Sequence, residues 1–275
     1  DLPTARPLSA EEPLMQEAEY HVLAEQEGGH WWYRSLRRRV LTRLRREARR
    51  RGHPLTVFDA GCGTGGLLQS LAREGAVAQC SGCDASPVAL QYCHQRGLPV
   101  RAASLHDLVT WPERFDLVLS MDVLYHQNVD PPRAMAAMAT LLQPGGLLLL
   151  NVAAMPCLAR RHDRRVLGAR RFRPDELRRL AASSGLAVES LGYWNSWLMP
   201  LVWLQARLER NEPEPAAKPA DSAVQPPAAM INRLLIVLLN LEGQVSRLLP
   251  LPWGSSLLLQ ARRPDDHQDN RHFPA

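Results

Sequence analysis

Short apolar runs that alternate with helical segments constrain the fold of this sequence most. Runs such as residues 115–120 (FDLVLS) and 147–152 (LLLLNV) are too apolar for a strand with one face in water. Strands of this kind are typical of parallel sheets that helices cover on both faces. Because crossover connections are right-handed, we predict an α/β fold with a Rossmann-like, doubly wound, mostly parallel seven-stranded sheet. The predicted strands are residues 55–60, 77–83, 99–103, 115–120, 147–152, 186–193 and 256–262.

Composition divides the rest of the chain. An arginine-rich segment before the first strand carries apolar residues at helical spacing, and a segment rich in Pro and Ala interrupts an apolar insertion before the last strand. We therefore expect an N-terminal helix and a helical insertion around the sheet domain. The predicted units are an extended lead (1–18), a helical cap (19–54), the sheet domain (55–196), a helical lid insertion (197–250) with a flexible linker (212–229), the last strand (251–263) and a disordered tail (264–275).

Charge and cysteine content limit which partners and metal sites we expect. The net charge of +5 favours an anionic partner such as nucleic acid or a membrane surface, although an arginine-rich composition without functional meaning explains it equally well. The Cys80-x-x-Cys83 pair has only Cys93-His94 nearby as further ligands, so we expect no metal site. With no signal-like run and no apolar stretch of membrane-spanning length, we expect a cytoplasmic protein, with association at a membrane surface left open.

A glycine-rich turn follows the first predicted strand (residues 57–66, VFDAGCGTGG). Its Gly61-x-Gly63-x-x-Gly66 spacing also fits a dinucleotide-binding turn. However, the carboxylate of Asp59 just before the glycines would repel a pyrophosphate and attract an ammonium group. Asp84, at the end of the second strand, can bind both hydroxyls of a ribose. The two carboxylates together favour a nucleoside cofactor that carries an amino acid.

These segments resemble the class I S-adenosylmethionine (SAM)-dependent methyltransferases of type 11/12. The resemblance covers roughly residues 19–200 and the last strand, through motifs at residues 59–66, 83–86, 115–126 and 142–150. It implies that the chain is a methyltransferase, that SAM is the cofactor and that S-adenosylhomocysteine is the product. The cofactor contacts that it implies in the sheet domain are Asp59, Ala60, Gly61, Cys62, Gly63, Asp84, Ala85, Ser104, Leu105, Ser120 and Met121.

The segment Glu27-x-x-His30-Trp31-Trp32-Tyr33 resembles the N-terminal entry of a subgroup of these enzymes. There we expect Trp32 to face the sulfonium through a cation–π contact and Arg37 to bind the methionine carboxylate. The alternative is that the aromatic side chains only hold the helix against the sheet.

Methyl transfer requires alignment of the acceptor, and a base only where the acceptor must lose a proton. His126, just after the fourth strand, is one candidate base. The adjacent pair His162 and Asp163, after the fifth strand, is the other. Residues expected to shape the acceptor pocket are His30, Tyr33, Tyr125, Tyr193, Asn195 and Trp197.

The apolar residues of the insertion predict a lid, a homodimer face or a contact with lipid. We therefore predict a small hydrophobic acceptor of the natural-product or lipid/isoprenoid type. The sequence leaves the accepting atom open among O, N, C and S. Alternatives are an RNA methyltransferase, an NAD-dependent dehydrogenase and a SAM-binding partner without catalysis. Against nucleic acid, no stacking aromatics are interleaved with the arginines.

Overall fold

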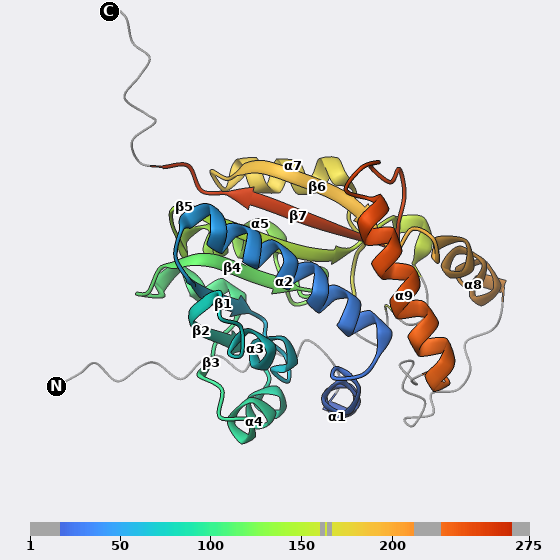
Figure 1. The fold of residues 1–275 in the computed structure, drawn as a ribbon, viewed down its shortest axis with the longest axis horizontal. Helices are drawn as coiled ribbons and strands as arrows, with labels where there is room; N and C mark the ends of the chain where they lie inside the picture. Colours follow the sequence, from blue (N-terminus) through green and yellow to red (C-terminus); the bar gives the residue numbers. More distant parts are fainter. Residues whose placement is uncertain (1–16, 160–162, 164–166, 212–226, 266–275) are drawn as a thin grey trace, which may run out of the picture.

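The computed structural model describes residues 17–159, 163, 167–211 and 227–265. The predicted lead, linker and tail fall mainly on the other residues and so lie outside the described part of the chain. A seven-stranded sheet forms the centre, in the order β3-β2-β1-β4-β5-β7-β6 (Figure 1). All strands are parallel except β7, which runs antiparallel to β5 and β6. The strands are β1 (Leu55–Ala60), β2 (Val77–Asp84), β3 (Val100–Ala102), β4 (Phe115–Met121), β5 (Leu142–Ala153), β6 (Ala187–Trp194) and β7 (Ser256–Arg262). The predicted α/β fold is confirmed.

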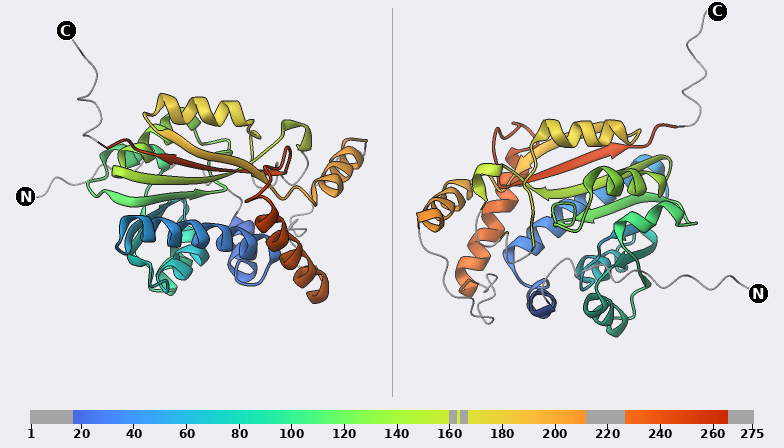
Figure 2. Two further views of the ribbon diagram at one scale, coloured as in Figure 1. Left: turned by 45° about the horizontal axis from the view of Figure 1, so that its top comes forward. Right: turned by 180° about the vertical axis from the view of Figure 1, so that it is seen from behind.

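Helices cover both faces of this sheet (Figure 2). Helices α5 (Pro131–Thr140) and α7 (Pro174–Ser183) lie on one face, together with the 3-10 helix η1 (Leu105–Thr110). Helices α2 (Trp31–Arg51), α3 (Gly66–Leu71) and α4 (Pro87–Gln95) lie on the other. The remaining helical segments are α1 (Glu17–Gln26), the 3-10 helix η2 (Pro156–Leu158), α8 (Met199–Asn211) and α9 (Ala229–Val245).

The two-sided covering explains why β4 reads as a continuous apolar run. Side chains of a strand point alternately to opposite faces. Leu117 and Leu119 contribute to the core beneath α2, whereas Val118 contributes to the core beneath α5. All three are completely buried, so β4 has no face that water reaches.

The N-terminal cap differs from the single helical segment that the sequence predicted. Helix α1 ends at Gln26 and α2 begins at Trp31, with two glycines between them. His30 caps α2, since its Nδ1 accepts a hydrogen bond of 3.3 Å from the backbone N–H of Trp32. Within α2 the predicted apolar stripe is confirmed: Leu36, Val40, Leu44 and Ala48 are buried against the sheet.

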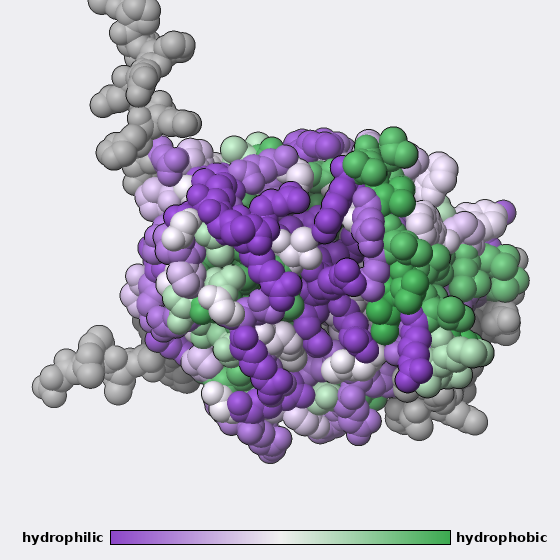
Figure 3. All heavy atoms as spheres, in the orientation of Figure 1, coloured by the Kyte–Doolittle hydropathy of each residue, from purple (hydrophilic) through white to green (hydrophobic). Residues whose placement is uncertain are grey.

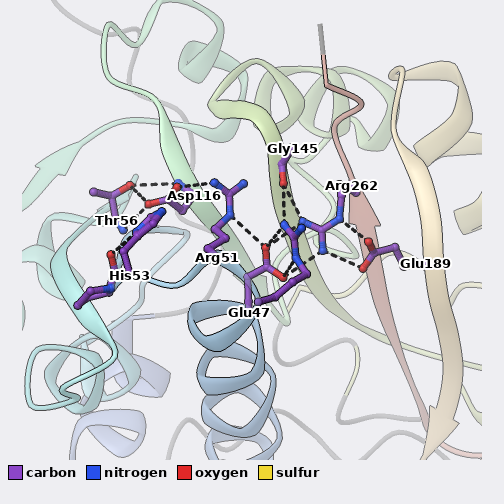
Figure 4. Close-up of polar contacts among 10 residues, drawn as sticks. Glu47, Arg51, His53, Thr56, Asp116, Gly145, Glu189 and Arg262 are labelled. Atoms are coloured by element: carbon purple, nitrogen blue, oxygen red, sulfur yellow. Dashed lines mark hydrogen bonds and ion pairs between the residues drawn. The ribbon is translucent and has the colours of Figure 1, made fainter. Parts of the chain in front are cut away.

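Four arginines of α2 pair with carboxylates: Arg39, Arg45, Arg50 and Arg51. Glu47 accepts hydrogen bonds from Arg50, Arg51 and Arg262, and Arg51 also donates to Asp116 at 2.8 Å (Figure 4). Burial raises the pKa of Glu47, but the hydrogen bonds from Arg50 and Arg262 prevail and lower it to about 2. This network ties the end of α2 to β4 and β7.

Helices α8 and α9 form the insertion between β6 and β7, and α9 packs across α2 (Figure 1). Arg39 of α2 and Glu242 of α9 form a buried ion pair of 3.2 Å at the crossing. Of the helices in the described part of the chain, none is long and apolar enough to cross a membrane.

Candidate cofactor and acceptor site

A cavity of about 880 Å³ opens at the carboxyl ends of β1, β2 and β4. Its wall includes the glycine turn after β1, both N-terminal helices, the loop after β4 and one side of α8. Ligands of doubly wound sheets bind at this edge. Fourteen of the residues predicted from sequence line the cavity: His30, Trp32, Tyr33, Arg37, Asp59, Gly61, Cys62, Gly63, Asp84, Met121, Tyr125, His126, Asp163 and Asn195.

The glycine turn brings the backbone to the cavity. Gly61 and Gly63 have φ angles of 83° and 54°, a region that favours glycine. A Cβ atom added at Gly61 would lie 2.5 Å from a methyl carbon of Val123, so the turn packs directly on the loop after β4.

Asp59 is 2% exposed at the end of β1 and borders the cavity. Its Oδ1 atom has no hydrogen-bond partner among the described residues. Burial, and then the charges of Asp84 and Glu27, raise the pKa of Asp59 to about 7. A buried carboxylate oxygen left without a donor fits a ligand that brings a cationic N–H group, as the ammonium group of SAM does.

Asp84, at the end of β2, is held by the backbone. It accepts hydrogen bonds from the N–H groups of Gly63 (2.8 Å) and Ser86 (2.9 Å). Burial raises its pKa, while these backbone donors act in the opposite direction. The carboxylate keeps further lone pairs for the hydroxyls of a ribose. Tyr20 of α1, which sequence reasoning missed, is completely buried in the wall of the same part of the cavity.

Glu27 links the N-terminal helices to the glycine turn. Its carboxylate accepts from the N–H of Gly66 at 3.0 Å and forms an ion pair with Arg96. Its carbonyl oxygen accepts from Arg37 at 2.7 Å. Arg37 therefore lies in the cavity wall but bonds to the backbone, and its predicted contact with a methionine carboxylate stays a prediction.

Trp32 connects the cavity to the sheet. Its ring stacks on Trp194 of β6 with 4.6 Å between centroids, and its indole N–H points to Asp122 at 3.4 Å. The stacking supports the reading in which this aromatic holds α2 to the sheet. The cation–π role is compatible with its place in the wall and stays a prediction.

Seven predicted site residues lie outside the cavity wall, and the surroundings of four of them are clear. Ser120 turns away and donates to the carbonyl of Ala60, and Ser104 caps η1. Tyr193 packs against the core on the side of α5, and Trp197 is 40% exposed. The residues outside the wall are Ala60, Ala85, Ser104, Leu105, Ser120, Tyr193 and Trp197.

The two predicted sources of a base are placed differently. His126 is buried in the wall, and its Nε2 donates to the carbonyl oxygen of Asp122 at 3.1 Å. Asp163 forms a two-fold ion pair with Arg171, at 2.7 and 2.8 Å. His162 lies outside the described residues.

Comparisons with known proteins identify the family of the chain. A family model described as a methyltransferase domain matches residues 30–191, more than half of the chain. The chain belongs to this methyltransferase family. S-adenosylmethionine is its cofactor, as the resemblance of its motifs implied.

Individual relatives match a smaller part of this chain than the family model does. The chain is 41% identical to a ubiquinone biosynthesis O-methyltransferase of Cereibacter sphaeroides over 103 residues, which are 35% of this chain and 40% of that protein. It is 34% identical to the protein of the same name from Serratia proteamaculans, over 48% of this chain and 60% of that one. The chain thus spans about two to three fifths of these relatives.

Among solved structures, a SAM-dependent methyltransferase from Archaeoglobus fulgidus superposes with a TM-score of 0.55 at 15% identity. The match covers 88% of this chain and 99% of that one. This similarity supports the fold.

Several residues of the site went unnoticed in the sequence. Asp122 stands directly after β4, and Asn151 interrupts the apolar run of β5. A polar residue in a strand that is buried on both faces needs a partner, so Asn151 was a usable signal. Tyr20 and Glu242 carried no such signal, because their contacts come from distant segments, whereas Arg171 pairs with Asp163 only eight residues away.

Proposed function

We propose that this methyltransferase transfers the methyl group of SAM to a hydroxyl oxygen of a small, largely apolar acceptor of the lipid or isoprenoid type. The cavity carries the proposal, because two chemically different sets of residues line one continuous space. One set contains Asp59 and Asp84, and the other consists of apolar residues of the insertion. The apolar set is Leu198, Leu201, Val202, Leu208 and Leu235.

Two further observations support the acceptor class. The curated relatives bear the name ubiquinone biosynthesis O-methyltransferase, which favours oxygen as the accepting atom and a quinone-like compound as the acceptor. Moreover, some of the arginines of α2 that would invite RNA are paired with carboxylates of the protein, as Arg39 is with Glu242 and Arg45 with Glu74.

The residues divide the work of this reaction. When bound, SAM supplies a methyl carbon activated by its sulfonium sulfur. Asp59 binds the ammonium group and Asp84 the ribose hydroxyls, while the glycine turn allows close approach of the backbone. The apolar side chains of α8 and α9 exclude water from the acceptor and hold it in line with the methyl group.

The experiment is a turnover assay with an alkyl catechol series, for example 4-methyl-, 4-hexyl- and 4-decylcatechol, and with transfer RNA in parallel. We expect the catechols to be O-methylated, with a kcat/KM that rises with the length of their alkyl chain, and we expect no methylation of RNA. Methylation of RNA alone would overturn the proposal. Binding of S-adenosylhomocysteine without turnover of any catechol would do the same.

The insertion also exposes an apolar stripe, which we define as Met230, Ile231, Leu234, Val237 and Leu241 of α9. These side chains are between 47% and 73% exposed. They follow helical spacing on one side of α9, and a band of hydrophobic surface runs over this helix in Figure 3. Arg233 of α9 and Arg247, two residues after the helix, are exposed as well. Exposed apolar residues together with arginines on the same segment fit the surface of an anionic bilayer.

We propose that this stripe rests on an anionic lipid surface from which the apolar acceptor enters. Cosedimentation with vesicles tests it: binding should require phosphatidylglycerol and fall at least tenfold in the Leu234→Ser, Leu241→Ser double variant. Val109→Ser, which alters an equally exposed apolar residue on η1, is the control. A dimer in light scattering that the double variant abolishes, without vesicle binding, would instead assign the stripe to a second copy.

A further inference from the structure

Asp122 occupies a strained position in the cavity wall. It follows β4 directly and has a φ angle of 62°, which is costly for a residue with a side chain. Such strain persists where neighbouring contacts hold the residue, and it is often found at functional positions. Two backbone contacts hold Asp122: its N–H donates to the carbonyl of Asn151 at 3.0 Å, and its own carbonyl accepts from His126 Nε2 at 3.1 Å.

The carboxylate of Asp122 is oriented by a second layer of hydrogen bonds. Its Oδ1 accepts from the side-chain amide of Asn151 at 2.7 Å. The amide of Asn151 cannot turn around without loss, because its Oδ1 accepts from the indole N–H of Trp194 at 2.8 Å. Trp194 in turn stacks on Trp32, with 4.6 Å between ring centroids, and the guanidinium of Arg39 lies over its ring at 4.7 Å. Asn151 is completely buried, so water cannot replace these partners.

The surroundings leave Asp122 basic but ionised near neutral pH. Burial raises its pKa to about 6, although the hydrogen bonds from Asn151 and Trp32 lower it. The titratable groups around it are Tyr33 of α2 and, on its own loop, Tyr125 and His126. Burial, followed by the charge of Asp122, raises the pKa of both tyrosines. They therefore stay protonated where Asp122 is ionised. A base whose pKa approaches the working pH is more effective than an ordinary carboxylate.

We propose that Asp122 is the proton acceptor for the acceptor hydroxyl and that Asn151 positions it, an assignment that rests on the proposed function. The hydroxyl oxygen forms a bond to the methyl carbon, and the bond between that carbon and sulfur breaks with its electron pair remaining on sulfur. The hydroxyl proton passes to the carboxylate of Asp122, which later releases it to water. His126, whose Nε2 proton is bound to the carbonyl of Asp122, is a positioning residue in this scheme.

The first experiment compares Asp122→Asn with wild type, using SAM and 4-hexylcatechol between pH 5 and 9. For wild type, kcat/KM should rise with pH through about 6 and then level off, because only the ionised carboxylate accepts the proton. Asp122→Asn should lose this rise and lower kcat by about 10²–10⁴-fold, with the dissociation constant for S-adenosylhomocysteine changed less than threefold. Asp122→Glu should restore part of the activity.

Two variants separate Asp122 from its neighbours. Asn151→Ala removes a hydrogen bond that lowers the pKa of Asp122, so the rise in kcat/KM should move to higher pH. His126→Asn removes the imidazole and should keep the rise near pH 6. If His126→Asn abolishes the rise and Asp122→Asn keeps it, His126 is the base and the proposal is overturned.

A readout independent of turnover uses the indole N–H of Trp32. In the complex with S-adenosylhomocysteine, its ¹⁵N resonance, assigned through Trp32→Phe, should shift with a midpoint near pH 6 in wild type but not in Asp122→Asn. An unchanged midpoint in the variant contradicts the assignment. Wild-type turnover that Asp122→Asn leaves intact overturns only this inference, whereas a wild type without turnover overturns the proposed function and this inference with it.

Discussion

At the residue scale, the buried carboxyl group of Asp59 lowers the free energy of unfolding of the protein without ligand. Its pKa of about 7 in the fold exceeds the ordinary value of 3.8. Between these two pH values the native state keeps a proton that the unfolded chain has released. The free energy of unfolding therefore falls as the pH rises from about 4 to 7. A cationic ligand group that pairs with this carboxylate would offset the cost.

We predict that Asp59→Asn stabilises the protein without ligand above pH 7. The gain is at most roughly 4 kcal/mol, since one pKa unit corresponds to about 1.36 kcal/mol, and it should vanish near pH 4. Thermal unfolding of both proteins between pH 4 and 8 measures it. Calorimetry should show weaker binding of S-adenosylhomocysteine by the variant. Equal midpoints at pH 8 would contradict the burial of an unpaired carboxylate.

A second prediction at this scale concerns Gly61. Gly61→Ala combines an unfavourable positive φ with a contact of 2.5 Å to Val123. Gly97→Ala is the matched control, because Gly97 also has a positive φ, of 68°, but no atom within 4 Å of an added Cβ. We expect a cost of about 1–2 kcal/mol for the control and an additional 1–3 kcal/mol for Gly61→Ala. Only Gly61→Ala should weaken binding of S-adenosylhomocysteine, by tenfold or more.

At the scale of elements, one side chain of α9 organises the entry to the insertion. Glu242 is completely buried and accepts from Arg39. It also accepts from the backbone N–H groups of Asn195, Ser196 and Trp197, at 2.7 to 3.0 Å. The carboxylate thus joins α9, α2 and the start of the segment that leads to α8. An insertion of mostly apolar helices is held in place by a buried charge.

We predict that Glu242→Ala destabilises the protein by about 3–5 kcal/mol, because Arg39 and three N–H groups lose a buried acceptor. Glu242→Gln should cost less, since its amide oxygen still accepts. Asp175→Ala is the control: its ion pair with Arg179 is exposed, and the unfolding midpoint should not move. Urea titrations measure all three variants. A loss for Glu242→Ala no greater than for the control would mean that the insertion is not anchored there.

At the scale of the whole molecule, the cavity joins segments from both ends of the chain. Tyr20 lies in the second ten residues and Ser256 begins the last strand, yet both contribute to its wall. A ligand in this cavity therefore contacts most of the elements that must come together on folding. Binding to the native state alone stabilises the entire domain by mass action.

We predict that S-adenosylhomocysteine at one hundred times its dissociation constant stabilises the protein by about 2.7 kcal/mol. For a chain of this length, this raises the unfolding midpoint by roughly 5–10 °C. NAD at the same concentration should leave the midpoint unchanged, because the carboxylate of Asp59 beside the glycine turn would repel its pyrophosphate. Differential scanning fluorimetry decides between the two ligands, and a shift with NAD alone would contradict the cofactor assignment.

The sequence by itself determined the sheet, the glycine turn and the cofactor. Apolar strands and turn glycines are local patterns, and each reports its own segment. Asp59 and Asp84 could be placed because each ends a strand, and the carboxyl ends of parallel strands meet at one edge. The same argument correctly placed His126 in the cavity wall. It failed for Ser104 and Ser120, because their hydroxyl groups form hydrogen bonds with backbone groups of the protein.

Only the tertiary structure decided how the chain surrounds that site. The orientation of Asp122 depends on Asn151, Trp194 and Arg39, which come from three separate elements. Likewise, the pairing of Glu242 with Arg39 spans some two hundred residues. A sequence pattern cannot report such contacts, because the direction of each side chain depends on how distant elements pack against one another.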